Sequence, residues 1–489
     1  MGNIAKLLLI ALFVIACMLA YRSITITSNQ LVAPILAPKV LLEDSVVSRL
    51  QTALRLKTIS YDDETLFDTQ MFFKLRDHIL ASYPKINDQL ELEIVNDMTL
   101  LFYWKGSDPS LKPVALLHHL DIVPVEKASL KKWDADPFSG DILNGYIYGR
   151  GALDDKGAAM STLEAVELLL LNGFKPKRSI YLAFGHDEEV GGKRGAQAVV
   201  KALNNRGIML SFVLDEGGAV VSGVMPGLDK EVAMIGIAEK GYVSLLLRAE
   251  AGSGHSSTPP KETAAGVLSK ALVKLEDNPF PLRLSEPVKI NLQYLAPELS
   301  VPMRVVLSNL WLFEPLVVRI LDQDPSTSAM VRTTTAITMV RAGVKDNVLP
   351  SVADAVVNFR ILPGDTAEFV KQRVEELIDD DRLTINFLDA FYSNPSEISD
   401  HTAYGFNLIE KTIVKVFNDN DTSVLTAPYM LMGGTDGRHY ERIAENVYRF
   451  NPIEIDSQDL SRIHGINERI SVDNYFNMIR FYYHLIEQI

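Results

Sequence analysis

The sequence predicts an α/β fold with a mainly parallel sheet and a smaller α+β domain inserted into it. Between residues 41 and 240, short apolar runs typical of buried strands alternate with helical patterns, and this order favours a parallel sheet. Residues 241–392 have a different order of elements, so we expect the main domain to consist of residues 41–240 and 393–489. The insert is expected to contain strands at Tyr242–Ala249, Ala355–Ile361 and Thr384–Leu388 and a helix at Thr366–Asp379.

Three apolar runs of the main domain are predicted strands, and each ends beside polar residues. The runs are Val114–Leu117, Ser179–Phe184 and Ser211–Leu214, and Ala158–Leu171 has the periodicity of a helix. Acidic or histidine residues follow each run directly. Ligands of open parallel sheets bind beyond the carboxyl ends of the strands, so we expect a site at this edge.

The composition excludes one class of partner. The chain has 489 residues and a formal net charge of -14. An acidic surface repels phosphate backbones, which argues against a nucleic-acid partner.

The N-terminus has the pattern of a secretory signal. The apolar run Leu7–Ala20 is shorter than the roughly 20 residues of a comfortable membrane span. We expect a signal peptide at 1–22, a linker at 23–40 and a secreted protein, with an uncleaved signal anchor as the alternative. The only cysteine, Cys17, lies in this segment, so a metal site of the mature chain must use His, Asp and Glu. Asn420 begins a glycosylation sequon that is usable only in the secretory pathway.

Two motifs in the first half of the main domain carry candidate metal ligands. In LLHHLDIVP, His119 ends an apolar run, and Asp121 is close enough to fix its tautomer. In GRGALDDKG, Asp154 and Asp155 open a helix after a glycine turn. A carboxylate there can bridge two metals, although a plain helix cap is the alternative.

Further acids and a histidine complete the set. Glu188 and Glu189 follow the second run, so one can bind metal while the other handles protons. Asp215 and Glu216 follow the third, and His464 lies in RIHGINERIS before the last helix. Together these residues could hold two zinc ions and leave one carboxylate free as a base.

These motifs together resemble the aminoacylase/carboxypeptidase family of co-catalytic zinc metallopeptidases. The resemblance covers essentially the whole chain after the signal and implies a zinc-peptidase-type catalytic domain with a lid/dimerisation insert. Within the family, the chain is most similar to the branch that makes and hydrolyses N-fatty-acyl amino acids, and next to the carboxypeptidase S branch. The supporting fragments are SGHSSTPPKET, SNLWLFEP, RTTTA and RIHGINE.

The resemblance implies a role for each candidate ligand. His119 would bind one zinc with Asp121 orienting it, Asp154 would bridge both ions, and Glu188 would be the general base. The remaining ligands would be Glu189, Glu216 with Asp215 as its rival, and His464. The family has one histidine where this chain has HHLD, and we interpret His118 as a neighbour rather than a ligand.

The resemblance also implies residues that contact substrate. His255 would stabilise the oxyanion in a partner subunit's site, and Asn347 would lie near the substrate. Arg438 is the first candidate to bind an amino-acid carboxylate, and Arg360 is the weaker one. Part of Ile290–Ile320 would border a fatty chain, although packing of the lid or of the dimer interface explains its composition equally well.

The expected activity is therefore reversible hydrolysis of N-fatty-acyl amino acids with two Zn²⁺ per subunit. The implied partners are fatty acids, amino acids and N-acyl amino acids, a second subunit in a homodimer, and lipid surfaces or lipoproteins. A dipeptidase or carboxypeptidase of the same mechanism is the first alternative. A non-catalytic lipid or amino-acid carrier is the second, and the complete ligand set with an intact Glu188 argues against it.

Overall fold

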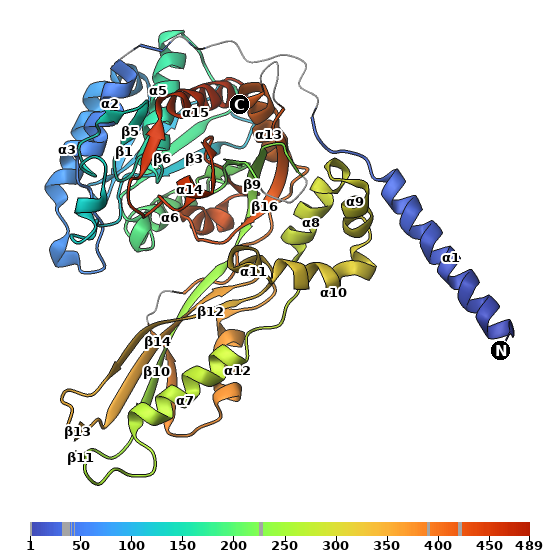
Figure 1. Cartoon of the computed structure of the whole chain (residues 1–489). Coiled ribbons are helices and arrows are strands. Elements are labelled where there is room, and N and C mark those ends of the chain that lie inside the picture. Colours follow the sequence, from blue (N-terminus) through green and yellow to red (C-terminus); the bar gives the residue numbers. More distant parts are fainter. Residues whose placement is uncertain are drawn as a thin grey trace. The chain divides into compact units, whose positions relative to one another are not determined.

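The computed structural model divides the chain into two compact units, shown in Figure 1. Unit 1 contains Met1–Ser28, Ala238–Glu397 and Met430–Gly434, and unit 2 contains Asn29–Ile237, Ile398–Tyr429 and Thr435–Ile489. The structure describes residues 2–31, 40, 42–43, 45–223, 228–388, 392–418 and 423–489. The expected insert, 241–392, falls within the range of unit 1.

Unit 2 is built on a large mixed sheet whose central strands are parallel. The order is β1-β2-β6-β3-β7-β17-β9-β8-β18, with β16 paired to β9. Strands β6, β3, β7 and β17 are mutually parallel, and antiparallel pairs flank them. The predicted parallel centre is therefore confirmed. The strand bounds are β1 Glu91–Val95, β2 Thr99–Trp104, β3 Val114–His119, β6 Ile180–Gly185, β7 Val213–Asp215, β8 Val220–Val221, β9 Val232–Glu239, β16 Leu425–Leu431, β17 Val447–Arg449 and β18 Glu454–Ile455.

Helices cover both faces of this sheet, which explains its near-continuous apolar strands. Every residue of β3 is buried. Its side chains alternate, so Leu117 packs with the helix α6 while His118 faces α5. The helices are α2 Ser45–Arg55, α3 Thr69–Ser82, α4 Pro84–Gln89, α5 Lys156–Leu171, α6 Ala196–Asn205, α13 Tyr404–Phe417, α14 Ser457–Leu460 and α15 Val472–Ile486, with short 3₁₀ helices η1 Glu64–Leu66, η2 Leu130–Lys132, η3 Glu188–Val190 and η5 Asp436–Ile443.

A small three-stranded sheet joins segments that are far apart in sequence. Its order is β19-β5-β4, with β4 at Ile142–Leu143, β5 at Tyr146–Tyr148 and β19 at Arg469–Ser471. The antiparallel pairing of β5 with β19 brings the GRGALDDKG and RIHGINERIS motifs side by side.

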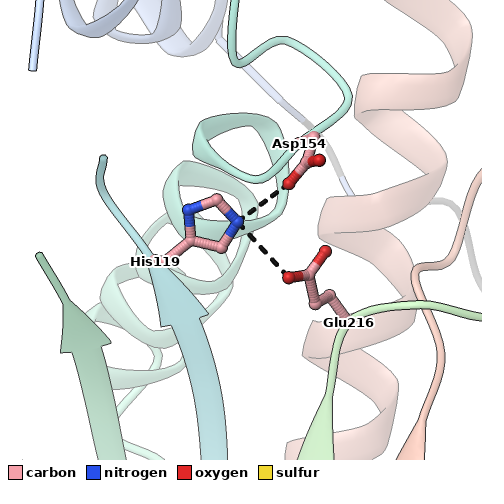
Figure 2. A group of neighbouring side chains, drawn as sticks. All are labelled: His119, Asp154 and Glu216. Atoms are coloured by element: carbon pink, nitrogen blue, oxygen red, sulfur yellow. Dashed lines mark hydrogen bonds and ion pairs between the residues drawn. The ribbon is translucent and has the colours of Figure 1, made fainter. Parts of the chain in front are cut away.

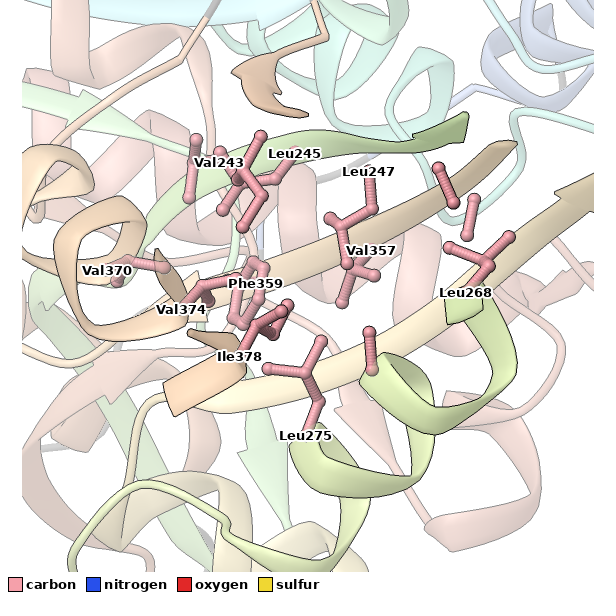
Figure 3. Packing of buried hydrophobic residues seen from close by; sticks show 14 of the residues in the cluster. Val243, Leu245, Leu247, Leu268, Leu275, Val357, Phe359, Val370, Val374 and Ile378 are labelled. Carbon is pink, nitrogen blue, oxygen red and sulfur yellow. The ribbon is translucent and has the colours of Figure 1, made fainter. Parts of the chain in front are cut away.

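Unit 1 contains a four-stranded antiparallel sheet, β12-β14-β10-β15, with α7 and α12 packed on one face. Apolar side chains of alternate strand positions, such as Leu245 and Val357, meet Leu268 of α7 and Val374 of α12 in the core shown in Figure 3. The elements are β10 Gly241–Glu250, β11 Gly254–His255, α7 Ala264–Asp277, β12 Thr334–Ala342, β13 Val348–Leu349, β14 Val352–Ile361, α12 Ala367–Ile378 and β15 Leu383–Phe387.

A helical segment precedes β12, and the sequence analysis did not predict it as helical. It consists of α8 Glu286–Leu295, η4 Ala296–Glu298, α9 Val301–Leu307, α10 Leu310–Leu321 and α11 Pro325–Val331. Unit 1 also includes the N-terminal helix α1, Gly2–Thr25. This helix is longer than the apolar run Leu7–Ala20, because polar residues at both ends continue it. By length and composition it could cross a membrane, and a signal sequence has the same properties.

Lys240 of unit 1 is a buried cation whose titration should appear in the stability of the fold. Its Nζ donates to the carbonyls of Ala329 and Arg332 at 2.9 and 2.8 Å. Burial, together with the nearby charge of Arg360, lowers the pKa of Lys240 to about 7.

We expect wild-type stability to rise with pH above 7 relative to the Lys240→Met variant. In the unfolded chain the pKa of this ammonium is 10.5, so between pH 7 and 10.5 the unfolded chain binds a proton that the folded chain releases. The difference in free energy of unfolding should grow by up to about 1.4 kcal/mol per pH unit. Denaturant unfolding at pH 7, 8 and 9 measures it. The exposed-lysine control Lys345→Met should parallel the wild type, and parallel curves for Lys240→Met would contradict the assignment.

Candidate metal centre

The candidate ligands lie at one edge of the sheet of unit 2. His119 is the last residue of β3, η3 follows β6 after a short turn, and Glu216 follows β7 directly. Because these three strands are parallel, their carboxyl ends meet at the same edge. The predicted convergence of strand ends thus has a simple topological cause.

One group of ligands is formed by His119, Asp154 and Glu216 (Figure 2). Nε2 of His119 lies 2.8 Å from Oδ1 of Asp154 and 3.3 Å from Oε1 of Glu216. A single imidazole nitrogen carries at most one proton and cannot donate well to both oxygens. The three atoms lie within 4.8 Å of one another, which fits a shared cation.

A second group shares Asp154 and adds Glu189 and His464. Nε2 of His464 lies 3.0 Å from Oδ2 of Asp154 and 3.2 Å from Oε1 of Glu189. The latter contact lacks hydrogen-bond geometry, and Oε1 of Glu189 is buried without a hydrogen-bond partner among the described residues. Each oxygen of Asp154 therefore faces one histidine, as a carboxylate that bridges two cations would.

The backbone fixes the ring of His119. Its Nδ1 lies 3.0 Å from the carbonyl oxygen of Asp121 and 3.5 Å from the carboxylate of the same residue. Because a carbonyl only accepts hydrogen bonds, Nδ1 must be the donor. In the neutral ring this leaves Nε2 without a proton, which is the form that binds a metal. Asp121 thus lies beside the ring of His119, and the acceptor nearest to Nδ1 is its backbone carbonyl rather than its carboxylate.

The carboxylate of Asp121 holds the turn that carries the two adjacent glutamates. It accepts hydrogen bonds from the backbone N–H groups of Glu188 and Glu189, both at 3.2 Å, and from the hydroxyl of Ser60 at 2.7 Å. Asp121 is fully buried. It therefore positions η3 relative to β3, and the sequence analysis did not identify Ser60 as part of this arrangement.

Glu188 belongs to neither group of ligands. Burial raises the pKa of its carboxyl well above the usual range, and the carboxylates of Glu216, Asp436 and Glu189 raise it further against the opposing effect of His119. A carboxyl beside the ligands, with raised proton affinity, has the property expected of a proton acceptor.

Asp215 and Glu216, the two alternative ligands after β7, differ in their hydrogen bonds. Asp215 accepts from the backbone N–H of Gly437 at 2.5 Å and from that of Glu216 at 3.0 Å. Its carboxylate thus holds the turn at Gly437, while Glu216 faces His119. Glu216 is the one found in a ligand group.

His118 lies outside both ligand groups. Its Nδ1 is 2.9 Å from Oδ2 of Asp155, and its Nε2 is 2.8 Å from the hydroxyl of Thr162. Burial lowers the pKa of His118 to about 3, so the ring is neutral. With both nitrogens engaged on the α5 side of β3, this histidine connects the strand to the start of that helix.

Arg150 and Glu468 form a buried ion pair next to the candidate ligands, and this pair was not expected from the sequence. Arg150 pairs with Glu468 at 2.5 Å, and its second nitrogen donates to the carbonyls of His464 and Gly465 at 3.0 and 2.9 Å. Glu468 also accepts from the backbone N–H of Leu153 at 3.0 Å. The pair therefore joins the loop of His464 to the turn before Asp154. The signal available in the sequence was the presence of opposite charges, Arg150 and Glu468, in two glycine-containing motifs.

The remaining predicted residues lie elsewhere. In unit 1, His255 and Asn347 are exposed near the β11–β13 pair, and the N–H of Ser256 donates to the carbonyl of Asn347 at 3.2 Å. Arg360 lies in β14, and its guanidinium is 4.9 Å from the ring centre of Tyr242.

In unit 2, Arg438 is half-buried in η5, and its charge lowers the pKa of Asp436 against the larger effect of burial. Asn420 lies outside the described residues.

A cavity of about 330 Å³ adjoins the ligands within unit 2. Its lining includes His464, Arg150 and Lys132. Among the candidate ligands, the cavity contacts His464.

Comparisons of the sequence place the chain among known hydrolases. The family model described as "Peptidase family M20/M25/M40" matches residues 115–488. The "Probable carboxypeptidase S-like 2" of Dictyostelium discoideum is 41% identical over 99% of this chain and 94% of its own length. The "N-fatty-acyl-amino acid synthase/hydrolase PM20D1" of Mus musculus is 42% identical over 91% and 87%. "Carboxypeptidase S" of Saccharomyces cerevisiae is 30% identical over 91% and 84%.

Solved structures agree in fold. The M20 family metallo-carboxypeptidase Sso-CP2 from Sulfolobus solfataricus matches with a TM-score of 0.68 at 18% identity, over 91% of this chain and 99% of that one. The dinuclear metal binding peptidase YXEP of Bacillus subtilis matches with a TM-score of 0.55 at 13% identity, over 91% and 98%. The family match, the relatives and the paired ligand groups agree: the chain belongs to peptidase family M20/M25/M40 and is a metallo-amidohydrolase.

Proposed function

We propose that this protein is a two-zinc amidohydrolase that cleaves and forms the amide bond between a fatty acid and an amino acid. The observation that carries the metal chemistry is the pair of ligand groups sharing Asp154. The fatty-acyl preference is supported by the relatives named N-fatty-acyl-amino acid synthase/hydrolase, which are about 40% identical.

The donor set favours zinc. Each ligand group contains one imidazole and two carboxylates, and the single cysteine lies in α1. Two zinc ions bound there would supply a water of lowered pKa and polarise the substrate carbonyl. Asp154 would hold both ions, with His119 and Glu216 on one side and Glu189 and His464 on the other.

In this proposal Glu188 moves the proton. It takes a proton from the attacking water and returns it to the leaving nitrogen of the amide. The reverse path joins a carboxylic acid to an amine, so the same residues serve synthesis and hydrolysis. The concentrations of the reactants then set the direction.

Residues outside the ligand groups would bind and orient the substrate. Arg438 would bind the carboxylate of the amino acid, with Arg360 as the weaker candidate. His255, from the lid of a partner subunit in a homodimer, would donate to the developing oxyanion, with Asn347 near it. An acyl groove bordered by part of Ile290–Ile320 remains a prediction.

A peptidase acting on dipeptides or C-terminal residues is the second candidate. It is favoured by the carboxypeptidase S names among the relatives.

Entry into the secretory pathway through the apolar helix α1, and use of the sequon at Asn420, are part of the main proposal.

Turnover of an N-oleoyl amino acid, compared with a dipeptide carrying the same C-terminal residue, separates the two candidates. We expect the acylated substrate to have the higher kcat/KM, because an acyl chain offers apolar surface that a dipeptide lacks. A higher kcat/KM for the dipeptide would reject the fatty-acyl assignment and leave the metal chemistry intact.

The metal content of the purified protein should be about two zinc equivalents per chain. The His464→Ala variant should retain about one, because the group of His119, Asp154 and Glu216 remains whole. Elemental analysis after gel filtration measures both. Full activity of a metal-free preparation would end the proposal.

Replacing the proposed base should abolish turnover without loss of metal. We expect Glu188→Gln to lower kcat by about 10²–10⁴-fold, because the side-chain amide of glutamine cannot accept the proton of the attacking water. Zinc content should be unchanged, since Glu188 belongs to neither ligand group. Glu91→Gln, on exposed β1, is the matched control, and wild-type kcat in Glu188→Gln would refute this role.

Breaking the buried ion pair behind the ligands should weaken metal binding. Glu468→Gln leaves the guanidinium of Arg150 buried without its carboxylate and loosens the loop of His464. We expect zinc affinity to fall by about 10–100-fold, as for other groups that orient ligands. Chelator competition measures the affinity.

The double variant Arg150→Met/Glu468→Gln tests the cause. It removes both charges, so it should recover part of the thermal stability that Glu468→Gln loses. Unchanged zinc affinity in Glu468→Gln would show that the pair does not position the ligands.

A further inference from the structure

The helices α9 and α10 of unit 1 form a sharply bent pair with an apolar outer surface. Their axes meet at 108°, and together they are apolar enough to resemble a broken membrane span. On α10, Val317 and Val318 face inward, whereas Trp311, Leu312 and Ile320 are 51%, 42% and 55% exposed.

The exposed residues lie on one stripe of the helix. Leu312, Leu316 and Ile320 are spaced four apart, and Trp311 adjoins the first of them. We call Trp311, Leu312, Leu316 and Ile320 the α10 face. Contiguous exposed apolar side chains of this kind mark a contact with another apolar phase.

The membrane-length helix α1 ends against the same bend. The amide of Asn309, the residue before α10, donates to the carbonyl of Leu19 at 3.3 Å, and its side-chain oxygen accepts from the indole N–H of Trp311 at 3.2 Å. The hydroxyl of Ser308 lies 3.5 Å from that of Ser23. Asn309 thus links the last turns of α1 directly to the α10 face.

The length of α1 indicates where the surface of a bilayer would lie along this helix. The apolar window of α1 is not buried by the protein. At about 1.5 Å per residue, a hydrocarbon core of roughly 30 Å needs about 20 residues, so a span that begins at Asn3 ends near Arg22. If those residues lie in lipid, the interface falls near Leu19–Ser23, where the α10 face begins.

We propose that the α10 face lies in the interfacial layer of a phospholipid bilayer, beside the end of α1. The chemistry suits that layer: Trp311 has an apolar body and a polar N–H, and the exposed Arg319 and Arg22 can reach phosphate groups. A second copy of the chain would also cover apolar side chains, but it would not explain the attachment of α1 at the same bend. This inference takes α1 as the uncleaved signal anchor, the alternative to a removed signal peptide, and it concerns the location of the enzyme rather than its activity.

Native tryptophan fluorescence tests the inference on the full chain with α1 retained. The chain has three tryptophans, and Trp104 and Trp133 are only 5% and 8% exposed, so Trp311 alone is accessible. With vesicles of phosphatidylcholine brominated on its acyl chains, we expect the emission of Trp311 to shift to the blue and to be quenched. The Trp311→Phe variant should show neither change.

Two further variants give the matched comparisons. In the Trp311→Phe background, Val344→Trp places an exposed indole on the turn after β12, outside the α10 face, and should not be quenched. Leu316→Glu should reduce the quenching of Trp311 while the circular dichroism spectrum stays unchanged.

Three results would overturn the inference. One is absence of Trp311 quenching while the protein floats with the vesicles. Another is equal quenching by monomeric brominated fatty acid without a bilayer, which would make the face part of an acyl-binding groove. The last is protection of Trp311 from acrylamide that rises with protein concentration, which would indicate self-association.

Discussion

Negative charge gathered around Asp154 is the constraint on which the rest of unit 2 depends. Asp154, Glu189 and Glu216 lie within contact of only two imidazoles, and Glu188 and Asp121 are close by. Carboxylates removed from water raise one another's proton affinity unless cations neutralise them. The parallel strands, the glycine turn before α5 and the buried pair of Arg150 with Glu468 all serve to hold these acids together. The fold therefore maintains an arrangement that is favourable chiefly when divalent cations are bound.

Sequence reasoning reached most of this arrangement because the ligands follow a topological rule. His119 ends β3, Glu216 follows β7 directly and Glu189 lies in the short helix after β6, and the carboxyl ends of these parallel strands share one edge. It could not distinguish the surroundings of Asp215 from those of Glu216, since Asp215 accepts a hydrogen bond from the N–H of Gly437, more than two hundred residues away. The contribution of the backbone of Asp121 was likewise invisible to an argument about side chains.

Other features were missed for a different physical reason. Arg150 and Glu468 are 318 residues apart, and only the pairing of β5 with β19 brings them together. The helices α8–α11 were not expected from the sequence, because the apolar composition of Ile290–Ile320 is equally compatible with a groove and with lid packing. In unit 1 the buried half of that segment packs internally, and the exposed half forms the α10 face.

The two candidate ligand groups are completed by residues from widely separated parts of the chain. His119 through Glu216 leave the ribosome early, whereas His464 and Glu468 follow nearly 250 residues later. Until then Asp154 has only His119 beside it, Glu189 lacks His464, and the turn before α5 lacks the Glu468 carboxylate that accepts the N–H of Leu153. A growing chain can therefore complete the group of His119, Asp154 and Glu216 before the group that needs His464, so the two halves of the proposed centre become available in a fixed order.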